Sequence, residues 1–252
     1  MSSPQQERRA FAAVTTLFFA WGFITSLVDP LVAAVKTIFR LSNVEAQLTA
    51  FAFFIAYGLV SLPAAALIGR MGQIPASLTG LGMMAGGCLV ILGGGQAGSY
   101  EAVLGGLFLI ASGITVLQVA ANPLAAVLGP PDKSHFRLTL SQAFNSLGTV
   151  LGPLIGARLL LRDLDKAQGA EALGRVGTSF LMLAGLIVAL GLFLWRMRRP
   201  IEEVAPPVRG TPSPLASLRT ALRSRWAVIG AAAIFLYVGA EVAIGTQMAL
   251  FL

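Results

Sequence analysis

The stretch from Ala102 to Leu128, AVLGGLFLIASGITVLQVAANPLAAVL, contains no charged residue. As an α-helix, a run of this length covers the roughly 30 Å of hydrocarbon in a bilayer, for which about 20 apolar residues suffice. Its apolar residues are continuous and do not alternate with polar ones, unlike those of a transmembrane β-barrel strand. The stretch therefore predicts a membrane-spanning helix.

The rest of the chain follows the same pattern. Hydrophobic residues make up 56% of the chain and charged residues only 12%, about half the charged share of a soluble domain. Apolar runs long enough to span a bilayer fall at Phe11–Val35, Leu48–Ile68, Leu78–Gly95, Ala102–Leu128, Leu138–Leu161, Val176–Trp195 and Trp226–Leu252. We therefore predict an all-α integral membrane protein with seven transmembrane helices, embedded in a lipid bilayer.

The basic residues indicate how these helices are oriented. Counted by predicted loop, twelve of the 18 Lys and Arg residues fall on one side of the membrane and six on the other. Cytoplasmic loops carry the excess of Lys and Arg, so the N-terminus and the loop after the sixth run are predicted to be cytoplasmic. Topology thus explains the net charge of +7, and we expect no nucleic-acid partner.

One basic, proline-rich stretch, from Arg196 to Arg225, separates two membrane units. We predict a cytoplasmic N-terminus over 1–10, a six-helix bundle over 11–199, a cytoplasmic linker over 200–225 and a seventh helix over 226–252. The seventh run reaches Leu252 with no polar residue after it. We therefore expect the chain to be a fragment, whose missing C-terminal half begins with this helix.

Two short motifs recur along the six-helix unit. DPLVAAV at Asp29–Val35 returns as NPLAAVL at Asn122–Leu128, 93 residues later, and YGLVSLP at Tyr57–Pro63 returns as LGTVLGP at Leu147–Pro153, 90 residues later. The first and fourth helices begin on opposite sides of the membrane, so the repeat is inverted. A 3+3 inverted repeat is found within each six-helix half of major facilitator transporters, which predicts that fold here.

Polar residues follow one face of three predicted helices. They are Gly22, Ser26 and Asp29 in the first, Ser112, Thr115, Gln118 and Asn122 in the fourth, and Thr139, Gln142, Asn145 and Thr149 in the fifth. For the hydroxyls, we favour hydrogen bonds to backbone carbonyls. An amide has two donors and one acceptor oxygen to satisfy. The Gln and Asn residues therefore either hold helices together or line a site for a ligand rich in hydroxyls.

Asp29 is the strongest single candidate for function. A carboxylate near the middle of a membrane helix costs about 2.5–3.5 kcal/mol, so it must face a cavity or be neutralised by a proton. The alternative is a structural acid, hydrogen-bonded to Ser26 or Thr25. Pro30 disrupts the helix beside the acid, and we expect Pro123 to break the fourth helix on the opposite side of the same cavity.

The chain lacks the sequence patterns of a membrane-embedded enzyme. It has one His and one Cys, and it contains neither an H-E-x-x-H nor a G-x-S-x-G motif. We therefore expect no enzymatic activity, no metal site and no cofactor other than a proton as coupling ion. Glu241 in the seventh helix is a secondary candidate for proton coupling.

Four stretches carry a family resemblance: WGFITSLVDPLVAAVK, QLTAFAFFIAYGLVSLPAA, GLFLIASGITVLQVAANPLAAVLGPP and RLTLSQAFNSLGTVLGPLIG. They resemble the fucose:proton symporter family of the major facilitator superfamily, and in particular its glucose/galactose branch. The resemblance implies two six-helix halves and alternating access in the bacterial inner (plasma) membrane. It also implies inward transport of a hexose, such as glucose, galactose or fucose, driven by the proton gradient.

By position, this resemblance places the family's helix-one acid at Asp29 and two sugar-contacting amides at Gln142 and Asn145. Gln118 stands where fucose-type members have a glutamate, so a scheme with two carboxylates does not carry over. The predicted substrate site comprises Trp21, Ser26, Gln118, Asn122, Gln142 and Asn145. Other possibilities are a symporter for N-acetylhexosamine, a sugar sensor and a transport-inactive truncated remnant.

Overall fold

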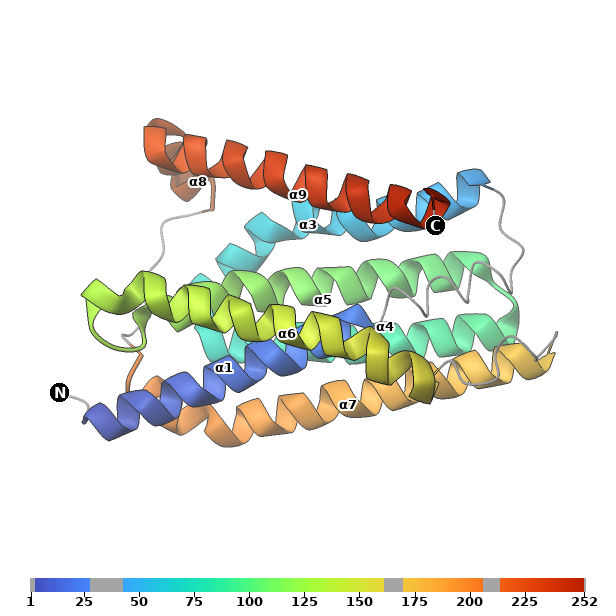
Figure 1. The fold of residues 1–252 in the computed structure, drawn as a ribbon, viewed down its shortest axis with the longest axis horizontal. Helices are drawn as coiled ribbons and strands as arrows, with labels where there is room; N and C mark the ends of the chain where they lie inside the picture. Colours follow the sequence, from blue (N-terminus) through green and yellow to red (C-terminus); the bar gives the residue numbers. More distant parts are fainter. Residues whose placement is uncertain (1–2, 28–42, 161–169, 206–213, 252) are drawn as a thin grey trace. The chain divides into compact units, whose positions relative to one another are not determined.

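The computed structural model of this protein describes residues 3–27, 43–160, 170–205 and 214–251. Within these ranges almost every residue is helical and no strand occurs, which confirms the all-α prediction. The helices are α1 Pro4–Ser26, α3 Asn43–Met71, α4 Gln73–Ala97, α5 Tyr100–Val127, the 3-10 turn η1 Pro131–Lys133, α6 Ser134–Leu160, α7 Ala170–Glu202, α8 Pro214–Arg223 and α9 Arg225–Phe251 (Figure 1). They form two units, residues 1–209 and 210–252.

Several of these helices have the length and composition of membrane spans. In the described part of the chain, four do so over Pro4–Ser26, Gln73–Ala97, Tyr100–Val127 and Gly177–Glu202. Shorter apolar helical segments cover Ile55–Met71 and Arg225–Ala240. The second part of the first predicted run, with Asp29 and Pro30, lies outside the described residues.

Helix ends reach beyond the apolar runs because polar residues cap them. At the start of α1, the backbone N–H of Gln6 donates to Ser3 Oγ at 3.3 Å, and Ser3 N–H donates to Gln6 Oε1 at 2.8 Å. This reciprocal pair is a capping box, so α1 begins at Pro4 rather than at Phe11. The helix α8 lies within the stretch 200–225 that is predicted to be a linker.

Glycines bring the backbones of α4 and α5 into direct contact. A Cβ atom on Gly113 would lie 2.8 Å from the backbone nitrogen of Met84, and one on Gly87 would lie 2.7 Å from the carbonyl oxygen of Gly106. No real side chain tolerates such distances, so only glycine fits at these positions. The two helices are joined by a tight turn in which Gly98 has a φ of +67°, a conformation that favours glycine.

A second close contact joins α1 and α6. A Cβ atom on Gly148 would lie 2.7 Å from the backbone nitrogen of Phe23, and one on Gly22 would lie 2.8 Å from Asn145 Nδ2. Gly152 is packed against the Ser26 side chain in the same way. Small residues at helix interfaces are typical of membrane proteins, since they let van der Waals contacts form between whole backbones.

Most of the contacts among the helices of the first unit are paired as a 3+3 repeat predicts, although the α5–α6 and α3–α4 contacts have no counterpart of similar extent. α1 contacts α6 and α7, while α5 contacts α3 and α4. Exchanging α1 with α5, α3 with α6 and α4 with α7 converts the first pair of contacts into the second. The α4–α7 and α1–α5 contacts map onto themselves under the same exchange.

The break expected at Pro123 is absent, because α5 continues through Asn122 and Pro123 to Val127. That expectation was wrong. A proline within a helix removes one backbone donor, here the one that would have bonded the carbonyl of Val119. Membrane helices tolerate this loss where neighbouring groups satisfy the freed carbonyl, so the helix need not end there.

The glycine contacts predict a position-specific effect on stability. Gly113→Ala places a Cβ against the Met84 backbone and must push α4 and α5 apart, which we expect to lower the free energy of unfolding by about 1–3 kcal/mol. Gly105→Ala on the same helix is the matched control, because a Cβ there meets no atom within 4 Å. Thermal unfolding of the purified variants in detergent measures the difference. Equal unfolding temperatures for the two variants would contradict this packing.

Candidate functional site

The six residues predicted to form a sugar site lie on three helices that contact one another. Trp21 and Ser26 are in α1, Gln118 and Asn122 in α5, and Gln142 and Asn145 in α6. Each of these three helices packs against the other two. The proposed proton carrier, Asp29, lies outside the described residues. Glu241 belongs to α9 in the second unit, and its side chain is also outside the described part.

The amide side chains form hydrogen bonds between helices. Gln142 Nε2 donates to Asn122 Oδ1 at 3.1 Å, which joins α6 to α5. Asn145 Nδ2 donates to the backbone carbonyl of Phe18 at 3.1 Å, which joins α6 to α1. Both α6 amides and Asn122 are half-buried. The amides therefore hold the three helices together at the point where the predicted site lies.

These contacts use only part of the amides' hydrogen-bonding capacity. An amide has two N–H groups and two lone pairs on its oxygen, and each of the two bonds above uses a single N–H group of its donor. Gln118 is also half-buried, and its side chain makes no hydrogen bond within the described part of the chain. Donors and acceptors thus remain on both α5 and α6 for a ligand that carries hydroxyl groups.

The hydroxyl groups on the same helix faces behave differently. Ser112 donates to the Phe108 carbonyl at 2.7 Å, Thr115 to Ala111 at 2.8 Å and Thr149 to Asn145 at 3.0 Å. Each bond stays within one helix, as the sequence analysis favoured for hydroxyls. Ser26 likewise donates to the Phe23 carbonyl at 2.9 Å and is covered by Gly152 of α6. The Ser26 side chain is thus packed between α1 and α6.

Trp21 is buried beside the amides. Its indole is 4% exposed and packs edge-on against Phe18, with ring centroids 5.5 Å apart. The indole N–H has no acceptor among the described residues. Leaving a buried donor unpaired costs about 1–3 kcal/mol, so this N–H marks a place where a ligand or water oxygen would be stabilised. Its neighbour Gly22 lies directly against Asn145.

Arg137 falls just before the run predicted at Leu138–Leu161, but it belongs to the first turn of α6 and has a role that the sequence did not predict. The side chain is 6% exposed. Its guanidinium group donates to the carbonyls of Pro130 at 2.9 Å and Gly129 at 3.3 Å, and also to those of Ala125 and Ala126. A cation at a helix C-terminus satisfies carbonyls that have no partner within the helix. Arg137 therefore fixes the end of α5 to the start of α6.

Comparison with known proteins gives the family of the chain. A sequence profile described as Major Facilitator Superfamily matches residues 11–252. The chain belongs to this superfamily. Over 253 residues, the superfamily member is 40% identical to a Brucella abortus protein named glucose/galactose transporter, with 100% of this chain and 60% of the relative covered. Over 252 residues it is 31% identical to the L-fucose-proton symporter of Escherichia coli K12, with 92% and 57% covered.

A solved structure supports the same assignment. The crystal structure of the E. coli fucose:proton symporter superimposes with a TM-score of 0.75 and 28% sequence identity, over 94% of this chain and 61% of the symporter. These matches confirm the resemblance drawn from the four sequence stretches. The superfamily member thus spans about three-fifths of the length of the proteins that it matches.

Proposed function

We propose that this superfamily member takes part in proton-coupled uptake of a hexose across the bacterial inner membrane by alternating access. The observation that carries the proposal is the amide cluster, formed by Asn122 of α5 with Gln142 and Asn145 of α6. Sugar hydroxyls both donate and accept hydrogen bonds, as do amides with unused capacity. The names of the relatives, two kinds of sugar transporter, support a transport role rather than catalysis.

Each residue has a part in this proposal. Gln118, Asn122, Gln142 and Asn145 bind the sugar hydroxyls, and Trp21 donates its unpaired N–H. Ser26 is left out of the site because its hydroxyl is already bonded to Phe23 and covered by α6. Asp29 carries the proton, with Glu241 as the secondary candidate.

The proposed site needs a second helical bundle. In major facilitator transporters, substrates bind near the bilayer midplane at the interface between two halves. We propose that α1 and α3–α7 form the first half, with a cytoplasmic N-terminus, and that α9 is the first helix of the second. The remaining helices would correspond to the part of the relatives that this chain does not cover.

Hexose uptake by a completed protein tests the proposal. We expect the chain joined to the uncovered part of the Brucella relative to accumulate glucose, galactose, fucose or N-acetylglucosamine in cells that lack their own hexose carriers. An uncoupler should abolish the accumulation. The 252-residue chain alone should accumulate none, because the proposed site also needs the second bundle. The proposal fails if the joined protein inserts into the membrane and binds none of these sugars.

Replacing one amide tests the sugar site. Gln142→Ala in the joined protein should weaken sugar binding by about 5- to 150-fold, because sugar and protein groups lose partners worth about 1–3 kcal/mol. Thr115→Ala is the control, since this hydroxyl bonds only its own helix. Equilibrium binding of radiolabelled sugar measures both variants. A change below twofold for Gln142→Ala would show that the amide only holds helices together.

Proton coupling is tested separately from binding. Asp29→Asn keeps the shape of the side chain and removes its titration, so pH-driven accumulation should be lost while counterflow exchange of sugar continues. Reconstituted vesicles with an imposed pH gradient provide the measurement, and Glu241→Gln serves as the comparison. Normal accumulation by Asp29→Asn would show that this acid is structural and that the proton binds elsewhere.

A further inference from the structure

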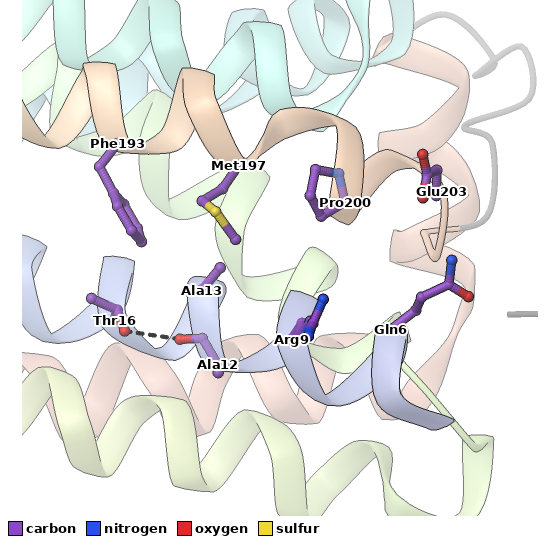
Figure 2. A pocket seen from close by; sticks show the side chains of 9 residues that line it. All are labelled: Gln6, Arg9, Ala12, Ala13, Thr16, Phe193, Met197, Pro200 and Glu203. Carbon is purple, nitrogen blue, oxygen red and sulfur yellow. Dashed lines mark hydrogen bonds between the residues drawn. The ribbon is translucent and has the colours of Figure 1, made fainter. Parts of the chain in front are cut away.

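A groove of about 500 Å³ lies between the first turns of α1 and the last turns of α7. Figure 2 shows the side chains that line it: Gln6, Arg9, Ala12, Ala13 and Thr16 from α1, and Phe193, Met197, Pro200 and Glu203 from the end of α7 and the residue after it. None of the residues of the proposed sugar site lines this groove. It is therefore a separate feature of the first unit.

The groove is polar at one end only. Glu203 lies across from Gln6 at one end of the groove, and Arg9 lies about one turn further along α1, across from Pro200 (Figure 2). The remaining wall consists of alanine, proline, methionine and phenylalanine side chains and Thr16, whose hydroxyl is already bonded to the Ala12 carbonyl at 2.9 Å. From Gln6 to Thr16 the groove follows about 15 Å of helix. Its shape and polarity suit a molecule with a charged head and an apolar tail.

The charged end of the groove lies where a headgroup would be. Arg198 stacks over the Trp195 ring at 4.5 Å near the end of α7. Trp and Arg at helix ends are typical of the membrane–water interface. Arg9 of α1 and Glu203, which directly follows α7, are both exposed at the polar end. Along the rest of the wall Ala13 is buried and Phe193 and Met197 are half-buried, while Ala12 and Thr16 are exposed. A soluble polar solute would leave the apolar wall without a partner.

We propose that this groove binds one phospholipid whose zwitterionic headgroup carries a primary amine, as in phosphatidylethanolamine. Arg9 and Gln6 donate hydrogen bonds to the phosphate, and the carboxylate of Glu203 accepts from the ammonium group. An acyl chain lies against Met197 and Phe193. A choline headgroup has no N–H to donate to Glu203, and a glycerol headgroup has no positive charge to pair with it.

A second groove differs from the α1–α7 groove in the charge of its lining. It has a volume of about 380 Å³ and lies between α4 and α7, where Leu78, Leu81, Ile187 and Trp195 are among its lining residues. No charged side chain belongs to that lining, so it can hold acyl chains but cannot select a headgroup. Selectivity for the amine headgroup is therefore expected only at the α1–α7 groove.

Lipid retention by the 252-residue chain tests the proposal. The chain is purified in detergent, incubated with equal amounts of phosphatidylethanolamine, phosphatidylglycerol and phosphatidylcholine, and analysed by native mass spectrometry. We expect one phosphatidylethanolamine to be retained about fivefold more than either other lipid. Glu203→Gln should remove this preference, and Arg9→Gln should lower retention of all three lipids. Ala12→Phe, which fills the groove, should do the same.

Neighbouring residues supply matched controls. Glu202→Gln and Arg8→Gln remove the same charges one position away, outside the groove lining, and should leave retention unchanged. The proposal would be overturned if the unaltered chain preferred phosphatidylglycerol and Glu203→Gln strengthened that preference. The groove would then bind an anionic lipid. Equal retention of all three lipids by the unaltered chain, or equal losses in the control variants, would show adventitious binding only.

Discussion

Helices in a bilayer gain little by burying apolar side chains against one another, because lipid tails are as apolar as leucine. This chain meets that constraint by bringing helix backbones into contact at glycines. Gly87, Gly106 and Gly113 do this between α4 and α5, and Gly22 and Gly148 do it between α1 and α6. The positions of the polar side chains depend on these contacts. Asn145 reaches the Phe18 carbonyl because Gly22 allows α6 to approach α1 so closely.

The amides have two roles that are compatible. One N–H group on each of Gln142 and Asn145 fixes a neighbouring helix, which leaves the side chain held in one orientation. The other donors and the oxygens stay unused by these bonds. A side chain fixed in this way loses little rotamer freedom when it binds a ligand, which favours affinity. The hydroxyls of Ser112 and Thr115 lack this second role, since each is bonded to its own helix.

The sequence predicts the helices better than it predicts their contacts. An uncharged run such as Ala102–Leu128 must be helical in a bilayer, and the structure has α5 at Tyr100–Val127. Helix starts were less accurate, because the capping box at Ser3 and Gln6 extends α1 into polar sequence. Arg137 falls just before the predicted run at Leu138–Leu161, whereas the structure places it in the first turn of α6. The carbonyls that it binds were not predicted either, since they depend on how the loop before α6 folds. The α1–α7 groove is lined by residues that are distant in sequence, and no sequence motif predicts it.

The glycines of α4 and α5 also restrict how these two helices can move. Gly80, Gly87 and Gly94 follow one another at intervals of seven, and Gly106 and Gly113 repeat that interval on the facing helix. Sliding one helix along the other by a single turn would take these glycines out of register, so that side chains would have to fit where the two backbones now touch. We therefore expect the pair to resist sliding, so that a conformational cycle would move these two helices together as one body.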